Sequence, residues 1–179
     1  MLHKEFLPYQ TVRNNAIKLA DHINREGFVP DVIYVSLRGG AYMGNVISEY
    51  FKIKRKDKRP AYYAAVVARS YRDIGAQDKV LLVDDIFDSG RTVNHLVEII
   101  MEQGIPRADV RVAVHDYKIR KYVTKQLPVQ PDYWCRFHEL ATPADDFWIH
   151  YMSHELVGLT EEEKKAHYFN EDPELTGVF

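Results

Sequence analysis

Hydrophobic positions recur at helical or strand-like spacing along the first two thirds of the chain. Steps of three and four residues predict three helices, with apolar faces formed by Val12, Ala16, Leu19, Ala20 and Ile23, by Met43, Val46, Ile47, Tyr50 and Phe51, and by Val93, Leu96, Val97, Ile100 and Met101. Short apolar runs predict strands at residues 31–37, 61–69, 80–83 and 109–115. This alternation is typical of an α/β fold with a mainly parallel sheet, in which ligands bind at the carboxyl ends of the strands.

The last third of the chain has a looser pattern. Strand-like pieces at residues 133–137 and 147–151 lie among Pro128, Pro131 and Pro143. Thr160 and Glu163 form a capping-box pair, which predicts a short terminal helix. Because no repeat or linker interrupts the pattern, we expect a single domain over residues 1–179.

Composition narrows the class of protein. The chain has 179 residues, of which 46% are hydrophobic and 28% charged, as in a folded globular protein. Its net charge of −2 argues against broad nucleic-acid binding. No apolar run approaches the roughly 20 residues that span a bilayer, so no membrane partner is expected. Cys135 is the only cysteine, which excludes an internal disulfide and a thiolate metal cluster and favours a reducing cytoplasm.

Residues 80–93 (VLLVDDIFDSGRTV) contain the pattern most indicative of chemistry. Four apolar residues are followed by Asp84 and Asp85, then by a turn rich in Asp, Ser, Gly and Thr, and then by a helix. A strand–turn–helix of this kind presents free backbone N–H groups to an anion, aided by the helix dipole. Gly90 permits a close backbone approach, and the hydroxyls of Ser89 and Thr92 can donate to a phosphate.

The paired acids indicate what kind of phosphate is bound. Asp84 and Asp85 would repel a phosphate, but they suit ribose hydroxyls or magnesium-bound water. A phosphate turn beside two acids therefore suggests a sugar phosphate. The sequence lacks the Gly-x4-Gly-Lys-Ser/Thr motif, which argues against a P-loop. The alternative is a generic α/β turn whose acids only cap a helix.

Residues 80–93 closely resemble the diagnostic segment of the type I phosphoribosyltransferases. The resemblance implies a central mainly parallel sheet flanked by helices, with a small hood from the N-terminal residues and roughly residues 116–155, and a short helix and tail at 160–179. It implies binding of phosphoribosyl pyrophosphate (PRPP) and Mg²⁺. Asp84 and Asp85 would hold the ribose hydroxyls, directly or through magnesium-bound water. The 5′-phosphate would lie against Asp88, Ser89, Gly90, Arg91 and Thr92, and Asp88 would also be the catalytic general acid/base.

Two further loops match the family. Arg38-Gly39-Gly40 follows the first predicted strand, where the family holds the pyrophosphate and often has a cis non-proline bond; the alternative is an ordinary turn with an exposed arginine. Ser70 and Tyr71 stand where the family has a mobile loop that closes over PRPP, and a solvated hairpin loop is the alternative.

Three residues are candidates for binding a nucleobase. By resemblance to 6-oxopurine enzymes, Lys118 would recognise the exocyclic oxygen, with Lys121 and Lys125 as alternatives. Trp148 would stack on the purine and backbone groups at the pair Trp148-Ile149 would read its edge, whereas a core position is the alternative for the tryptophan. His150 stands where bacterial relatives have an acid, which makes hypoxanthine at least as attractive as guanine.

The expected activity is transfer of the phosphoribosyl group from PRPP to a purine base, namely hypoxanthine, guanine or xanthine, with release of pyrophosphate in purine salvage. The family implies a homodimer or tetramer. One rival is a non-catalytic PRPP-sensing regulator that binds nucleic acid, which the basic run at residues 52–59 would serve; a solvated loop explains that run as well. The other is a phosphoribosyltransferase for a different base.

Overall fold

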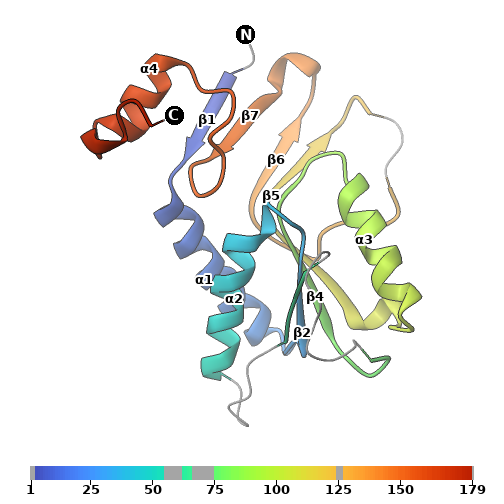
Figure 1. Ribbon diagram of the computed structural model, residues 1–179. Coiled ribbons are helices and arrows are strands. Elements are labelled where there is room, and N and C mark those ends of the chain that lie inside the picture. The colour runs from blue at the N-terminus through green and yellow to red at the C-terminus, as the bar shows by residue number, and fades with distance from the viewer. Residues whose placement is uncertain (1–2, 55–61, 66–74, 124–126, 179) are drawn as a thin grey trace.

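The computed structural model describes residues 3–54, 62–65, 75–123 and 127–178. Its main sheet has five parallel strands in the order β3-β2-β4-β5-β6 (Figure 1). These strands are β2 (Val32–Val35), β3 (Tyr62–Ala65), β4 (Val80–Phe87), β5 (Val110–Arg120) and β6 (Tyr133–Leu140). Strand β4, which carries the paired acids, is therefore central, with its carboxyl end beside those of β2 and β5.

Alternating side chains of the strands build one core on each face of the sheet. Leu81 and Val83 of β4 pack with α1 (Tyr9–Arg25) and α2 (Gly40–Lys54), whereas Val80 and Leu82 pack with α3 (Arg91–Glu102). The helices accordingly cover opposite faces (Figure 1). Because consecutive strand residues point to opposite faces, a fully apolar run such as 80–83 belongs in a sheet that is covered on both sides.

A second, two-stranded parallel sheet lies at one end of the molecule. It pairs β1 (His3–Leu7) with β7 (Phe147–Tyr151), two segments from opposite ends of the chain (Figure 1). Leu7, Val12, Ile149 and Tyr151 form its small core. The chain then passes over it into α4 (Glu161–Lys164), whose first turn has the predicted capping box of Thr160 and Glu163.

The α/β fold class is confirmed, with several differences in detail. Strand β4 continues through the acid pair to Phe87, and β5 extends to Arg120, so Lys118 lies within a strand and not in the loop after it. Strand β1 was not predicted from the sequence, because its five residues show no clear alternation. The predicted strand at 61–69 is described only over Tyr62–Ala65. No helix in the described part of the chain is long and apolar enough to cross a membrane.

Candidate functional site

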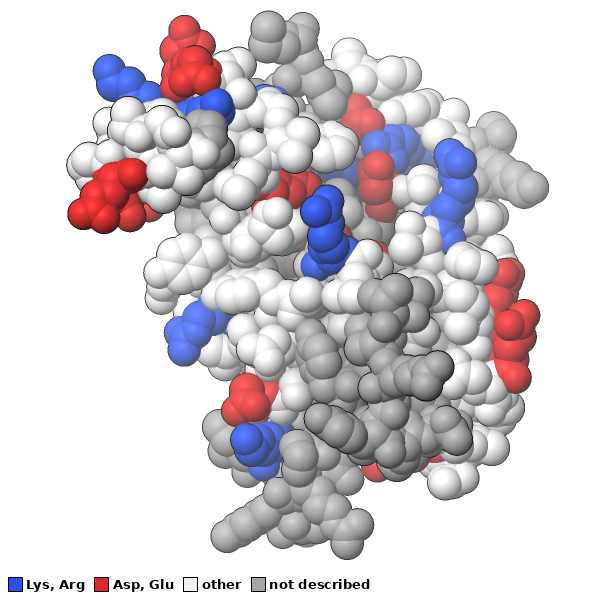
Figure 2. Space-filling model, in the orientation of Figure 1, with Lys and Arg blue, Asp and Glu red and all other residues white. Residues whose placement is uncertain are grey.

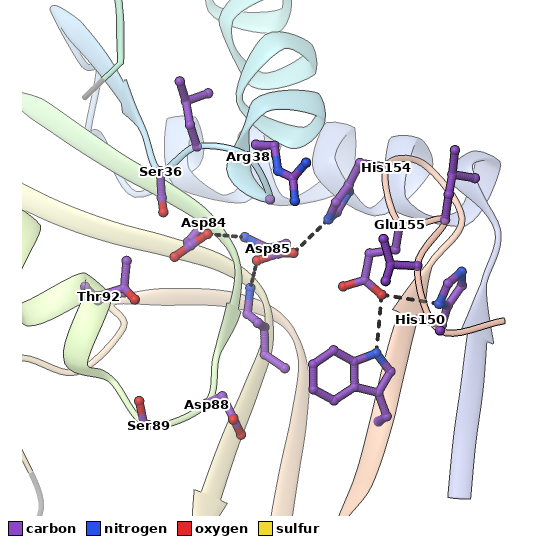
Figure 3. Close-up of a pocket in the computed structure, with 18 of the residues that line it drawn as sticks. Ser36, Arg38, Asp84, Asp85, Asp88, Ser89, Thr92, His150, His154 and Glu155 are labelled. Carbon is purple, nitrogen blue, oxygen red and sulfur yellow. Dashed lines mark hydrogen bonds and ion pairs between the residues drawn. The ribbon is translucent and has the colours of Figure 1, made fainter. Parts of the chain in front are cut away.

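A cavity of about 930 Å³ opens at the carboxyl ends of β2 and β4. Its sheet side is formed by residues 36–39, 84–86, 88–90, 92 and 93, and its opposite side by Lys4, Trp148, His150 and residues 154–158 (Figure 3). Most of the residues predicted to bind PRPP, namely Arg38, Gly39, Asp84, Asp85, Asp88, Ser89, Gly90 and Thr92, therefore line one space. Arg91 instead lines a neighbouring cavity, and Ser70 and Tyr71 lie outside the described residues.

The two acids occupy different environments. Asp84 is buried and accepts a hydrogen bond from the backbone N–H of Asp85, 3.0 Å away. Burial, followed by the neighbouring charge of Asp85, raises the pKa of Asp84 to about 8. Asp85 is held by the backbone N–H of Ile86 at 2.8 Å and by Nε2 of His154 at 3.1 Å. Ionisation of both acids is therefore unfavourable until a cation or hydrogen-bond donors stabilise the second charge.

Two glycines in the loop after β2 approach strand β4 closely. A Cβ at Gly39 would lie 2.3 Å from Cγ of Asp85, and one at Gly40 would lie 2.3 Å from the carbonyl oxygen of Val83. The two glycines thus let the loop lie directly against the acid-bearing strand. The Leu37–Arg38 peptide bond is cis, as the resemblance implied.

The turn between β4 and α3 also depends on a glycine. Gly90 is the N-cap of α3 with φ +73°, and a Cβ there would lie 2.5 Å from Cζ of Phe87. Gly90 has no side chain and α3 has no side-chain cap; the N–H of Arg91 reaches Oγ of Ser89 at 3.5 Å, and Ser89, Thr92 and Val93 line the cavity at this helix start. This arrangement suits a phosphate group.

The structure places the predicted base-binding residues in different surroundings. Trp148 lines the cavity with 52% of its surface exposed, and its indole N–H donates to Oε2 of Glu155 at 3.3 Å. Ile149 is buried in the small core between the two sheets. Burial raises the pKa of Glu155, although the hydrogen bonds from the Trp148 side chain and the Tyr151 backbone act in the opposite direction. The aromatic ring of Trp148 therefore has the carboxylate of Glu155 at its edge. Position 150, where bacterial relatives have an acid, is a histidine in this chain.

Lys118 and Asp88 both line a second cavity, of about 390 Å³, next to the first. Lys118 is only 4% exposed and reaches Oδ1 of Asp146 at 3.2 Å and the backbone oxygen of Phe147. Asp88 pairs with Nη1 of Arg120 at 2.6 Å. Asp88 therefore lines both the cavity that contains Trp148 and the cavity that contains Lys118.

A buried polar network joins the paired acids to the two-stranded sheet. Asp116 of β5 is fully buried, with ring nitrogens of His115 and His138 at 2.6 Å from its two carboxylate oxygens. The Tyr151 hydroxyl donates to Asp116 at 2.7 Å and lies 3.0 Å from the backbone oxygen of Asp85. Burial alone would raise the pKa of Asp116, but these hydrogen bonds hold it well below its usual range.

Sequence inspection missed several of these residues. His154 and Glu155 follow a predicted strand that ends at residue 151, and that position alone could have drawn attention to them. Arg120, Tyr151 and Asp116 carry no local signal, because each acts through a partner at least 22 residues away in the chain.

The donor set suits magnesium held together with a substrate. Among the described residues there is no cluster of three or more His, Cys, Asp or Glu that could hold a metal alone. Asp84 and Asp85 nevertheless supply two adjacent carboxylates to the cavity (Figure 3). Mg²⁺ commonly takes one or two carboxylates and completes its shell with water and substrate phosphates, so these residues fit it.

Charged groups of both signs surround the cavity. On the face shown in Figure 2, acidic and basic side chains lie interspersed, and the described residues there form no extended basic patch. Nucleic-acid binding normally requires such a patch. The described residues on this face offer no such patch, whereas residues 55–59 of the basic run lie outside the described residues.

Comparisons with known structures support the fold. Purine phosphoribosyltransferase from Pyrococcus horikoshii is 20% identical with a TM-score of 0.65, and the match covers 89% of this chain and 99% of that one. A hypothetical protein from Neisseria gonorrhoeae with bound ppGpp is 19% identical with a TM-score of 0.65, over 88% and 92%. Helicobacter pylori xanthine-guanine-hypoxanthine phosphoribosyltransferase is 16% identical with a TM-score of 0.56, over 86% and 93%. No curated protein sequence matches the chain significantly.

The family assignment rests on the sequence itself. The profile of the phosphoribosyl transferase domain matches residues 4–130, which include β4, the acid pair and the phosphate turn. This match covers well over half of the chain and agrees with the fold of the structural neighbours. The chain belongs to the phosphoribosyl transferase domain family.

Proposed function

We propose that this protein transfers the 5-phosphoribosyl group of PRPP to a 6-oxopurine base and releases pyrophosphate. One observation carries the proposal: the acid pair, the phosphate turn, the Arg38 loop and an exposed tryptophan face a single cavity. A ligand that used all four would combine a ribose, a 5′-phosphate, a diphosphate and a flat ring. PRPP together with a purine has these parts.

In the proposed complex, each end of PRPP has its own set of groups. The 5′-phosphate accepts from the first-turn N–H groups of α3 and from Ser89 and Thr92. The ribose hydroxyls donate to Asp84 and Asp85, and Arg38 contacts the diphosphate. Magnesium bound with the diphosphate would stabilise negative charge on the leaving group.

In the reaction, the bond between the anomeric carbon and the diphosphate oxygen breaks, and a bond to the purine ring nitrogen forms. The diphosphate leaves with the electron pair, and the proton on the purine passes to the carboxylate of Asp88. The salt bridge to Arg120 holds the carboxylate of Asp88, a residue that lines both cavities. Asp88 therefore acts as the general base in nucleotide synthesis.

The environment of Trp148 bears on which purine is used. A purine stacked on this ring would have its edge near the carboxylate of Glu155, which accepts N–H groups from Trp148 and Tyr151. A 2-amino group is an additional donor for that carboxylate, so this environment favours guanine over hypoxanthine. Glu155→Gln should reduce guanine use more than hypoxanthine use.

The test is steady-state pyrophosphate release with PRPP, Mg²⁺ and a panel of hypoxanthine, guanine, xanthine, adenine, uracil and orotate. We expect turnover with a 6-oxopurine and a loss of roughly 10²–10⁴-fold in kcat in Asp88→Asn, with PRPP binding retained. Asp109→Asn, at the amino end of β5, is the matched control and should keep full activity.

Two results would point elsewhere. Turnover with a pyrimidine alone would retain the reaction and replace the substrate. The non-catalytic regulator would be favoured if no base gave turnover while PRPP still bound and the protein bound RNA or DNA in a salt-sensitive way.

A further inference from the structure

Asp88 and Lys118, the two side chains expected to act on the base, both form ion pairs within one cluster of charged residues. Asp88 is in contact with Arg120, and Lys118 is in contact with Asp146. Arg120 and Asp146 contact each other, so the four charges form a continuous chain from the phosphate turn to β7. Neither Arg120 nor Asp146 lines the larger cavity, and neither carries a signal in the local sequence.

Arg120 holds Asp88 at two atoms. Its Nη1 lies 2.6 Å from Oδ1 of Asp88 and 3.2 Å from the backbone oxygen of the same residue. A guanidinium is planar and rigid, so contacts to the side chain and the backbone together fix the direction of the carboxylate. Without such a contact, a half-exposed aspartate at the end of a strand would sample several rotamers.

Asp146 in turn holds Arg120 and Lys118. One carboxylate oxygen accepts from Nε and Nη2 of Arg120, at 2.9 and 2.7 Å. The other lies 3.2 Å from Nζ of Lys118 and also accepts the backbone N–H of Phe147 at 2.9 Å. Each oxygen therefore serves a different cation, and a single carboxylate sets the separation between them.

Partial burial strengthens the contacts among Lys118, Arg120 and Asp146. Asp146 and Arg120 are about one fifth exposed at their side chains, and Lys118 is almost fully buried. Charge-assisted hydrogen bonds of this kind are stronger when they are partly desolvated. Loss of Asp146 would leave the buried ammonium group of Lys118 without its carboxylate partner and would free one end of Arg120, so both cations would move.

We propose that Arg120 and Asp146 are positioning residues for base chemistry: Arg120 orients Asp88 for proton transfer, and Asp146 fixes both Arg120 and the base-recognising Lys118. This inference rests on the proposed function, because it takes Asp88 as the proton acceptor. It adds that proton transfer and base recognition are coupled through one carboxylate.

The two residues should have different kinetic signatures. Arg120→Gln releases Asp88 alone, so kcat should fall roughly ten- to a hundredfold, while KM for PRPP and for the base changes little. Asp146→Asn loosens Arg120 and Lys118 together, so kcat should fall and KM for the base should rise. If Asp146 affects kcat only through Arg120, the double variant should have the kcat of Arg120→Gln.

The dependence of the kcat defect on the acidity of the base separates a positioning role from a general structural defect. An 8-aza analogue of the preferred purine has a more acidic ring N–H and needs less help from a base. We expect the defect of Arg120→Gln in kcat to shrink with this analogue, and Arg120→Lys to recover part of the activity. Arg25→Gln is the matched control, because this exposed arginine pairs with Asp21 within α1, lines neither cavity and should behave as wild type.

The experiment measures kcat and both KM values for wild type and these variants, together with PRPP binding and thermal unfolding. Unchanged kcat in Arg120→Gln would overturn the inference, as would equal losses with the natural base and its analogue. If Arg120→Gln does not fold, Arg120→Lys gives the same comparison. An inactive wild type would overturn the proposed function itself, so the two failures are distinguishable.

Discussion

The sheet side and the hood side of the cavity, the latter formed by β1, β7 and residues 152–158, are held in place differently. The sheet side depends on backbone geometry: glycines at positions 39, 40 and 90 allow two turns to approach β4. The hood side depends on side chains from distant parts of the chain. Tyr151 and His154 reach Asp116 and Asp85, and Arg136 of β6 contacts both carboxylate oxygens of Glu5 in β1.

This difference separates two tasks. A phosphate and a ribose are parts shared by all PRPP reactions, and rigid backbone turns suit them. The base is the variable part, and in the proposed complex it would lie against the side of the cavity that long-range polar contacts hold in place. A buried polar network is stabilising only when every member is satisfied. The hood side should therefore be more sensitive to single polar substitutions, and the sheet side to added atoms.

The largest expected effect comes from the hub of the hood network. Asp116→Ala removes a buried charge that binds His115, His138 and Tyr151 and should lower the free energy of unfolding by about 3–5 kcal/mol. Tyr151→Phe removes one hydrogen bond and should cost about 1 kcal/mol. Urea denaturation measures both. A loss below 1 kcal/mol in Asp116→Ala would contradict the view that this network holds the hood.

A smaller effect is expected where the sheet side is crowded. In Gly40→Ala the new Cβ would overlap the fixed carbonyl oxygen of Val83, which should cost about 1–3 kcal/mol of stability. In Gly39→Ala it would meet the carboxylate of Asp85, a side chain that can rotate away. That variant should retain more stability and lose PRPP affinity. Equal stability losses in both variants, followed by thermal unfolding and PRPP titration, would argue against this distinction.

The most gradual difference concerns pH in the unliganded protein. Asp84 has a raised pKa in the folded state, so its contribution to stability is present below pH 3.8 and is lost as pH rises toward about 8. Asp116 has a lowered pKa, so its contribution is present above the usual carboxyl pKa and is lost as pH falls below it. Each slope is at most about 1.4 kcal/mol per pH unit.

Two conservative variants assign these slopes. Asp84→Asn should flatten the stability profile between pH 4 and 8, and Asp116→Asn should flatten the acid side below pH 4. Denaturant midpoints across this range provide the measurement. A slope between pH 4 and 8 that persists in Asp84→Asn would mean that another group titrates there.

The sequence by itself determined the α/β class, the acid pair and the phosphate turn. Each is local: the apolar run 80–83 predicts a strand covered on both faces, and Gly90 with its neighbours predicts the turn before α3. The capping box at Thr160 was likewise predicted from a short segment, whereas the cis bond at Leu37–Arg38 was implied only by the resemblance of this loop to the family.

Only the tertiary structure decided how the hood closes the site. The pairing of β1 with β7 joins segments more than 140 residues apart, and it places Glu155 beside Trp148 and His154 against Asp85. The extension of β5 to Arg120 brings that arginine to both Asp88 and Asp146. Hydrophobic periodicity specifies which face of an element is buried, but it does not specify which polar side chains meet across elements, because those contacts depend on the relative placement of the whole backbone.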